Sequence, residues 1–413
     1  MARAASVPMH ARRPFALARR VMTSASLQAS ALSAALGGLF ALANLLLART
    51  LSVSDFADVT LAVTAVMLGQ TLGPLGQERV VVRHDLPATP ALLRRGIASA
   101  VLVAVALAMV ALLAYDMTPG IVALIVPGAV AGSLTLLASA RLQSERRFLL
   151  STMISQGAGL PLLAAAFSAL LAGGIDPRSV LVLFVLGLMG LAAWSWAYLL
   201  SRPPSATAVP FHWREALAIT GISGLAILFF NLERLAIPLL LPGQDLAHFA
   251  VLAAIVIAPF RMLQFGVGRT LVPHLRDAAT AAERRRLLLH EALLVGGIAL
   301  LAGVILAFAT PWVEAWVLGG KYATPPLLLA VVILAGLGKL FGAFAHAAMQ
   351  GLASERTIWL GNFVGWACLG LAVVAGIMGA HWGLAGLVAG TTAGAFCQAG
   401  LMLCLVTPQL RGR

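Results

Sequence analysis

The sequence from residue 216 to residue 241 reads ALAITGISGLAILFFNLERLAIPLLL, and this stretch decides the fold class. The run is longer than the roughly 20 residues that an α-helix needs to cross a bilayer. Glu233 and Arg234 lie inside it, where a charged side chain costs about 2.5–3.5 kcal/mol on insertion scales. Because such charges normally face a bundle interior or water, the stretch predicts a membrane-spanning helix that borders a polar interior.

The composition of the whole chain agrees with a membrane protein. Hydrophobic residues make up 61% of the sequence and charged residues 10%, whereas soluble domains carry about 25% charged residues. The three cysteines, Cys368, Cys397 and Cys404, lie in apolar runs and lack the spacing of a zinc site, a redox motif or a disulfide framework. The sequence therefore predicts no metal and no cofactor.

The net charge of +13 reflects topology rather than a nucleic-acid partner. Most Lys and Arg residues fall in the N-terminus, in alternate loops and in the C-terminal tail, whereas only Arg49, Arg178 and Lys321 fall in the other set of loops. An excess of positive charge marks cytoplasmic loops. We therefore expect both termini in the cytoplasm.

Apolar runs recur along the chain, each close to the length of one membrane crossing. The first is too long for the h-region of a signal peptide, so we expect it to be an uncleaved span. The predicted spans are 26–48, 57–77, 97–115, 120–140, 148–172, 179–200, 216–241, 249–272, 292–311, 324–350, 357–380 and 383–406. They predict an all-α polytopic membrane protein of about twelve helices. Its predicted parts are a basic cytoplasmic N-terminus (1–25), a six-helix bundle (26–200), a cytoplasmic linker (201–215), a second six-helix bundle (216–406) and a cytoplasmic tail (407–413).

Internal echoes indicate that the two halves are related. The tripeptide Ser-Glu-Arg occurs at 144–146 and again at 354–356, after the fourth and tenth runs. The pattern Arg-x-x-Val-x-His closes the second run at 79–84 and the eighth at 269–274. Since each half has an even number of spans, the repeats run parallel, and such halves rock about a site near the membrane midplane.

At this point the chain resembles the polysaccharide flippases of the multidrug/oligosaccharidyl-lipid/polysaccharide (MOP) exporter superfamily. The residues that carry the resemblance are Leu47 to Ala57 (LARTLSVSDFA), Asn231 to Leu235 (NLERL), Gly319 to Ala323 (GGKYA) and Gly383 to Leu387 (GLAGL). The resemblance implies two pseudo-symmetric six-helix bundles, as in the MATE transporters, and export of a lipid-linked oligosaccharide. Ala57 and Glu233 depart from the glycine and aspartate that this family often has, so no coupling ion is carried over.

The candidate substrate-binding residues are cations and amides inside the seventh, eighth and tenth runs. Asn231 and Arg234 share one helix face, as do Arg261 and Gln264, and Lys339 lies deep in the tenth run. Arginine suits a bidentate grip on phosphate. A structural ion pair, or an arginine that reaches for the membrane surface, is the alternative. A cationic interior predicts an anionic ligand.

Two further residues are weaker candidates for ion coupling. Glu233 either binds a coupling ion or neutralises a neighbouring arginine, and we favour neutralisation. His346 is either a proton relay or, in the favoured interpretation, a helix contact. We also expect Pro259 to loosen the eighth helix, and Gly386, Gly390 and Gly394 to form a face for close helix packing.

The sequence lacks the signatures of an enzyme. His290-Glu291 has no second histidine for a zinc-protease helix, and the predicted outer turns are too short to carry a catalytic domain. We expect a transporter that flips a polyprenyl-pyrophosphate-linked oligosaccharide across a bacterial cytoplasmic membrane by alternating access. Its partners would be membrane lipids and polysaccharide polymerases or glycosyltransferases. A cation-coupled multidrug exporter of the same fold, and a membrane polymerase or ligase, are the alternatives.

Overall fold

The computed structural model describes residues 25–202, 211–278 and 280–410, and the regular structure in these ranges is entirely helical. In them, 11 helices are long and apolar enough to cross a membrane, and a bent helix pair makes up to 12. The prediction of an all-α protein with about twelve spans is therefore confirmed. Residues 1–24, 203–210 and 411–413 of the predicted N-terminus, linker and tail lie outside the described residues.

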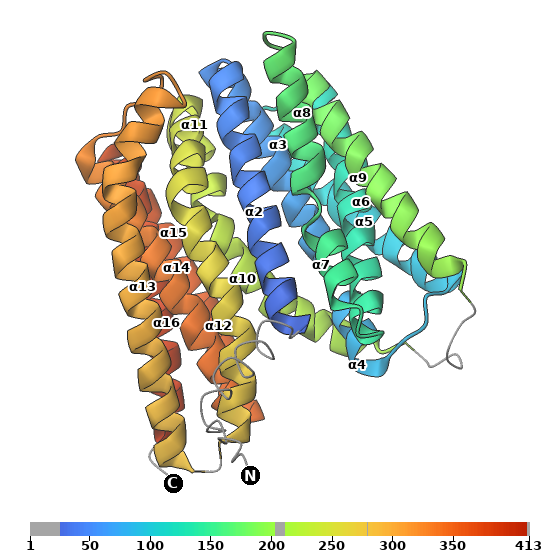
Figure 1. Ribbon diagram of the computed structural model, residues 1–413, viewed down its shortest axis with the longest axis vertical. Helices are drawn as coiled ribbons and strands as arrows, with labels where there is room; N and C mark the ends of the chain where they lie inside the picture. Colours follow the sequence, from blue (N-terminus) through green and yellow to red (C-terminus); the bar gives the residue numbers. More distant parts are fainter. Residues whose placement is uncertain (1–24, 203–210, 279, 411–413) are drawn as a thin grey trace, which may run out of the picture.

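The helices form two bundles that follow each other along the chain (Figure 1). The N-terminal half contains α2 (Ala25–Thr50), α3 (Val53–Leu72), α4 (Gln77–His84), α5 (Pro90–Ala114), α6 (Pro119–Ser144), α7 (Phe148–Gln156), α8 (Gly159–Leu171) and α9 (Pro177–Leu200). The C-terminal half contains α10 (Trp213–Leu240), α11 (Gly243–Leu252), the π-helix η1 (Ala253–Ile257), α12 (Ala258–Asp277), α13 (Ala281–Trp316), α14 (Pro326–Leu352), α15 (Glu355–Ala380) and α16 (Gly383–Leu410).

Short polar caps start several helices and keep the connecting turns brief. The Ser52 hydroxyl accepts a hydrogen bond from the Asp55 amide at 3.1 Å, and the Thr89 hydroxyl accepts one from Leu92 at 3.2 Å. Such caps satisfy amides that the first helical turn leaves without partners, and apolar surroundings raise the cost of leaving them unpaired.

The fifth predicted span, 148–172, is wrong as a continuous helix. The chain forms α7 and α8 instead, with a bend of 44° between them. Pro161 explains the break, because it has no N–H to donate to the carbonyl of Gly157. A side chain at Gly159 would lie 2.8 Å from the Leu36 carbonyl oxygen, so only glycine lets the start of α8 approach α2 this closely.

The predicted cytoplasmic loop 78–96 begins with helix α4 rather than irregular chain. Val80 and Val81 are fully buried and share a core cluster with Ala216 at the start of α10. The turn before α4 also contacts the start of α10. A Cβ atom at Gly76 would lie 2.1 Å from the Ala216 carbonyl oxygen, so a side chain does not fit there. Glu78 is buried here as well, although it lies outside the predicted spans.

Helices α15 and α16 pack at close range through the predicted glycine face. A Cβ at Gly386 would lie 2.2 Å from the Gly379 carbonyl oxygen, and one at Gly394 would lie 2.3 Å from the Ala372 Cβ atom. At Gly390 the Ala375 carbonyl oxygen is 2.2 Å away. The prediction of close packing through these glycines is confirmed.

We therefore expect Gly390→Ala to lower stability by about 1–3 kcal/mol, although alanine is the better helix former. Thermal unfolding of the purified protein in detergent measures this effect. Gly400→Ala on the same helix is the control, because a Cβ there meets nothing within 4 Å. The control should be neutral or stabilising, and an equal effect of the two substitutions would contradict the packing account.

Candidate functional site

A cavity of about 340 Å³ lies between the two halves of the protein. Helices α2, α3, α7 and α8 line it from the N-terminal half, and α10, α11, η1, α12 and α14 line it from the C-terminal half. Its volume falls in the range of about 300–1,000 Å³ that ligand sites occupy. All five predicted substrate-binding residues, Asn231, Arg234, Arg261, Gln264 and Lys339, lie on its wall.

An ion pair between α10 and α14 fixes the charge of this wall. The Lys339 Nζ atom lies 2.7 Å from Glu233 Oε2 and donates a second hydrogen bond to the Phe230 carbonyl at 2.9 Å. The Glu233 and Lys339 side chains are only 4% and 8% exposed. Glu233 thus forms its ion pair with Lys339, and its charge also acts favourably on the neighbouring Arg234. Neighbours along a helix point about 100° apart, so Glu233 and Arg234 face different surroundings.

Phe230 holds two cations at its ring. The guanidinium carbon of Arg261 lies 4.3 Å from the ring centroid, and the ammonium of Lys339 lies 5.0 Å from it. The face of an aromatic ring attracts cations, and the attraction is stronger where water is excluded. Phe230 was not among the predicted site residues, although its position four residues before Arg234 places the two residues on the same face of α10.

Arg234 and Arg261 give the cavity its net positive charge. Glu233 is engaged by Lys339, and the two guanidiniums are close enough to repel each other electrostatically. Asn231 donates its Nδ2 hydrogen bond to the Ile227 carbonyl at 3.0 Å, which leaves its side-chain oxygen as an acceptor. An anion between the two arginines would relieve their repulsion, so the wall is electrostatically suited to a negatively charged ligand.

The helix that carries Arg261 is distorted where the sequence predicts. Pro259 has no N–H for the Ile255 carbonyl, and the chain widens into the π-helix η1 just before it. Ala253, Ala254 and Ile257 of this segment line the cavity. The predicted loosening of the eighth span is confirmed, and it opens the backbone at the cavity wall.

The wall contributed by the N-terminal half is polar but uncharged. Asn44, Thr64 and Thr71 line the cavity, and each donates a hydrogen bond to a carbonyl of its own helix at 2.7–2.9 Å. Their oxygens remain able to accept. Gln70 instead donates to the Ser155 carbonyl at 3.2 Å and ties α3 to α7. A cationic wall thus faces a wall of neutral acceptors.

The weaker candidate His346 lies apart from these residues. It does not belong to the described lining of the cavity and makes a backbone hydrogen bond to Gly342 on its own helix. The side chain of Arg269, at the end of the eighth predicted span, lies outside the described residues.

The two halves also contact each other at the predicted outer end, outside the described lining of the cavity. Lys321 donates to the carbonyls of Ala48, at 3.2 Å, and Leu51 at the end of α2. The buried Tyr322 ring packs edge-on against Phe56, with centroids 6.3 Å apart. Burial lowers the pKa of Lys321, an effect that the charge of Asp55 opposes. Burial also raises the pKa of Tyr322 to about 12, so this ring stays neutral in the contact.

Comparison with known proteins gives matches among solved structures. The sequence matches no protein-family model, and it matches no curated protein. The fold is similar to a multidrug resistance MATE family transporter of the MOP superfamily in an inward-facing conformation (TM-score 0.64, 15% identity, 91% of this chain and 94% of that chain). It is also similar to the lipid II flippase MurJ in an inward closed conformation (TM-score 0.67, 12% identity, 92% and 86%). The eukaryotic MATE transporter AtDTX14 matches with a TM-score of 0.56 at 14% identity, over 95% and 98%.

The chain therefore has the fold that these MATE transporters and MurJ share. In this fold the cavity lies between the two halves, and both contribute to its wall.

The Glu233–Lys339 pair predicts a strong energetic coupling. We expect Glu233→Gln and Lys339→Met to destabilise the protein by about 3 kcal/mol each, because each leaves one buried polar partner unmatched. The double variant should regain most of that loss. Unfolding of the four proteins in detergent gives the coupling energy. Strictly additive losses in the double variant would show that the pair does not form.

Proposed function

We propose that this protein is a membrane transporter that flips a polyprenyl-pyrophosphate-linked oligosaccharide to the outer leaflet of a bacterial cytoplasmic membrane. The observation that carries the proposal is the cavity between the halves, where Arg234 and Arg261 supply a net positive charge. A pyrophosphate between a polyprenyl tail and a sugar unit matches that sign. The MOP fold supports transport, and one of its solved relatives is a lipid II flippase.

Each cavity residue has a role in this proposal. Arg234 and Arg261 grip the pyrophosphate, since a guanidinium fork matches phosphate oxygens in pairs. Lys339 uses two of its three N–H donors on Glu233 and Phe230, which leaves one for the ligand. The amides of Asn231 and Gln264 meet the sugar next to the phosphates.

The transport step follows the alternating-access scheme of related halves that rock about a central site. Lys321 and Tyr322 join the two halves at the predicted outer end. Likeness to transporters solved in inward-facing and outward-facing conformations supports such a cycle. Opening to the outside would break the hydrogen bonds from Lys321 to the end of α2.

A multidrug exporter is the second candidate, because several similar solved structures are MATE transporters. The sign of the cavity argues against cationic drugs, since two arginines repel them. A cation-coupled exporter would also need a carboxylate at its ion site. Glu78 is buried in the N-terminal half, but it lies outside the described lining of the cavity.

The proposal predicts the outcome of complementing a strain that lacks this protein. That strain should accumulate polyprenyl-linked repeat units and lose surface glycan. Arg261→Ala and Arg234→Ala should restore less than about a tenth of the flipping rate, because a hydrogen bond to a charged group contributes about 1.5–3 kcal/mol. Lipid extraction with a surface glycan assay measures both effects.

Arg285→Ala is the matched control, since Arg285 is an exposed residue of α13 and lies outside the cavity lining. It should complement fully, and all variants should insert in the membrane to the same level. Full activity of Arg261→Ala would remove this residue from the site. Unchanged lipid intermediates with increased sensitivity to cationic drugs would favour the exporter.

A further inference from the structure

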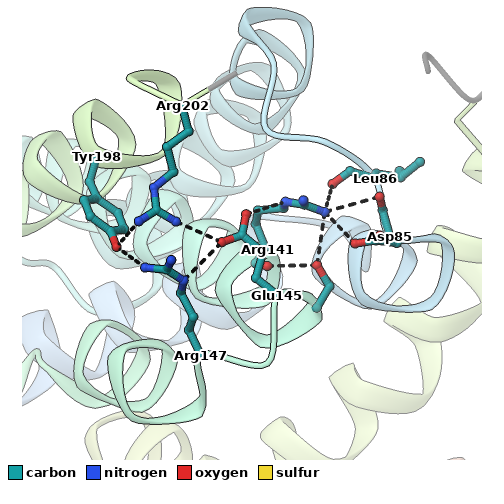
Figure 2. Close-up of polar contacts among 8 residues, drawn as sticks. Asp85, Leu86, Arg141, Glu145, Arg147, Tyr198 and Arg202 are labelled. Atoms are coloured by element: carbon teal, nitrogen blue, oxygen red, sulfur yellow. Dashed lines mark hydrogen bonds and ion pairs between the residues drawn. The ribbon is translucent and has the colours of Figure 1, made fainter. Parts of the chain in front are cut away.

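A second group of arginines lies in the N-terminal half (Figure 2), and none of its residues belongs to the described lining of the cavity. It joins the end of α6, the start of α7 and the end of α9. Its members are Arg141, Glu145, Arg147, Tyr198 and Arg202, and Figure 2 shows their side chains converging on Glu145 and the Tyr198 hydroxyl. We call these five residues the arginine cluster.

Arg141 is the structural member of the arginine cluster. Its side chain is 5% exposed, and its Nη1 atom lies 2.6 Å from Asp85 Oδ1 and 3.1 Å from the Leu86 carbonyl oxygen. Its Nε atom lies 3.2 Å from Glu145 Oε1. Arg141 therefore ties the turn after α4 to α6, and it engages Asp85 and one oxygen of Glu145.

The remaining oxygen of Glu145 serves two guanidiniums. Glu145 Oε2 lies 3.2 Å from Arg202 Nη1 and 3.6 Å from Arg147 Nε. Three arginines thus face two carboxylates in this group, which leaves an excess positive charge. Arg147 and Arg202 are 45% and 31% exposed, so this excess charge is accessible from outside the protein.

Tyr198 holds the two exposed arginines together and adds a hydrogen-bond donor of its own. Its hydroxyl oxygen accepts hydrogen bonds from both Arg147 and Arg202, and the Arg202 guanidinium lies 4.1 Å from its ring centroid. A phenol oxygen that accepts twice still has its own O–H to donate. Two guanidiniums and one hydroxyl that all donate form a receptor for an oxyanion.

Apolar side chains stand exposed beside these donors. Trp194 is 50% exposed and stacks on Tyr198 with ring centroids 6.0 Å apart. Phe148 and Leu149, directly after Arg147, are exposed too. Arg147 and Arg202 lie in predicted cytoplasmic segments. Tryptophan and tyrosine are enriched at the membrane interface, which fits the positions of Trp194 and Tyr198 beside them. Donors with an adjoining apolar surface match the boundary between lipid headgroups and acyl chains.

The repeated half does not carry the same set of residues. The tripeptide Ser-Glu-Arg recurs at 354–356, but Gly351 stands four residues before its glutamate, where Arg141 stands before Glu145. The arginine cluster is therefore not a general requirement of the duplicated fold.

From this geometry we infer that the arginine cluster binds the phosphate of an anionic phospholipid in the cytoplasmic leaflet. Arg147, Arg202 and the Tyr198 hydroxyl hold the phosphate oxygens, and the acyl chains lie along Trp194 and Phe148. Basic pockets between membrane helices on the cytoplasmic side are known to bind anionic headgroups. The site is separate from the cavity and does not depend on the transported substrate.

Thermal unfolding of the purified full-length protein, with added phosphatidylglycerol or phosphatidylcholine, tests the site. Phosphatidylglycerol should raise the unfolding midpoint of the wild type, and phosphatidylcholine should not. Arg147→Gln and Arg202→Gln should each weaken the apparent affinity about fivefold, and the double variant more than tenfold. Tyr198→Phe removes one donor with almost no change in shape, so it tests the site even if the double variant fails to fold.

Arg285→Gln is the matched control, because it removes one exposed arginine from another predicted cytoplasmic segment. Equal loss of the phosphatidylglycerol effect in this control would reduce the site to general surface charge and overturn the proposal. An equal midpoint shift with inorganic phosphate at the same concentration would identify a free anion as the ligand and would also overturn it. An undiminished response of Tyr198→Phe and both single arginine variants would exclude the cluster.

Discussion

The ion pair of Glu233 with Lys339 sets the charge distribution on which the interior depends. A buried ion without a partner is costly in a low-dielectric interior, and these two side chains meet at 2.7 Å between α10 and α14. Because Lys339 already balances the charge of Glu233, the two arginines leave the cavity wall with a net positive charge. The positive sign of the cavity therefore follows from a contact between side chains that are far apart in the sequence.

Phe230 links that pair to the rest of the site. Its carbonyl accepts from Lys339, and its ring lies near both Lys339 and Arg261. The π-helix before Pro259 widens the backbone just ahead of Arg261. The cationic wall is thus built by one aromatic ring, one ion pair and one helix distortion, whereas the opposite wall offers hydroxyls and amides that have already satisfied their own donors.

The sequence was sufficient for the number and order of the spans, because bilayer thickness and hydrophobic length leave little freedom. It could not show the break between α7 and α8, since a glycine and a proline in an apolar run also occur in helices that stay continuous. The amphipathic helix α4 was mistaken for loop because its charged residues dominate a short segment. The five cavity residues share a site as their positions inside the spans suggested, yet the partner of Glu233 depends on which helices face each other, and helical periodicity does not encode that.

The contact between Gly76 and Ala216 has a mechanical consequence. The first turn of α10 is packed into the core of the N-terminal half, whereas Leu225 and Leu232 of the same helix pack against Leu369 and Ala372 of α15. Helix α10 thus packs against the N-terminal half at its start and against the C-terminal half further along. A rotation of the halves that keeps both contacts would bend α10 between them, where Gly221 meets nothing within 4 Å. The stiffness of this segment would then oppose that rotation.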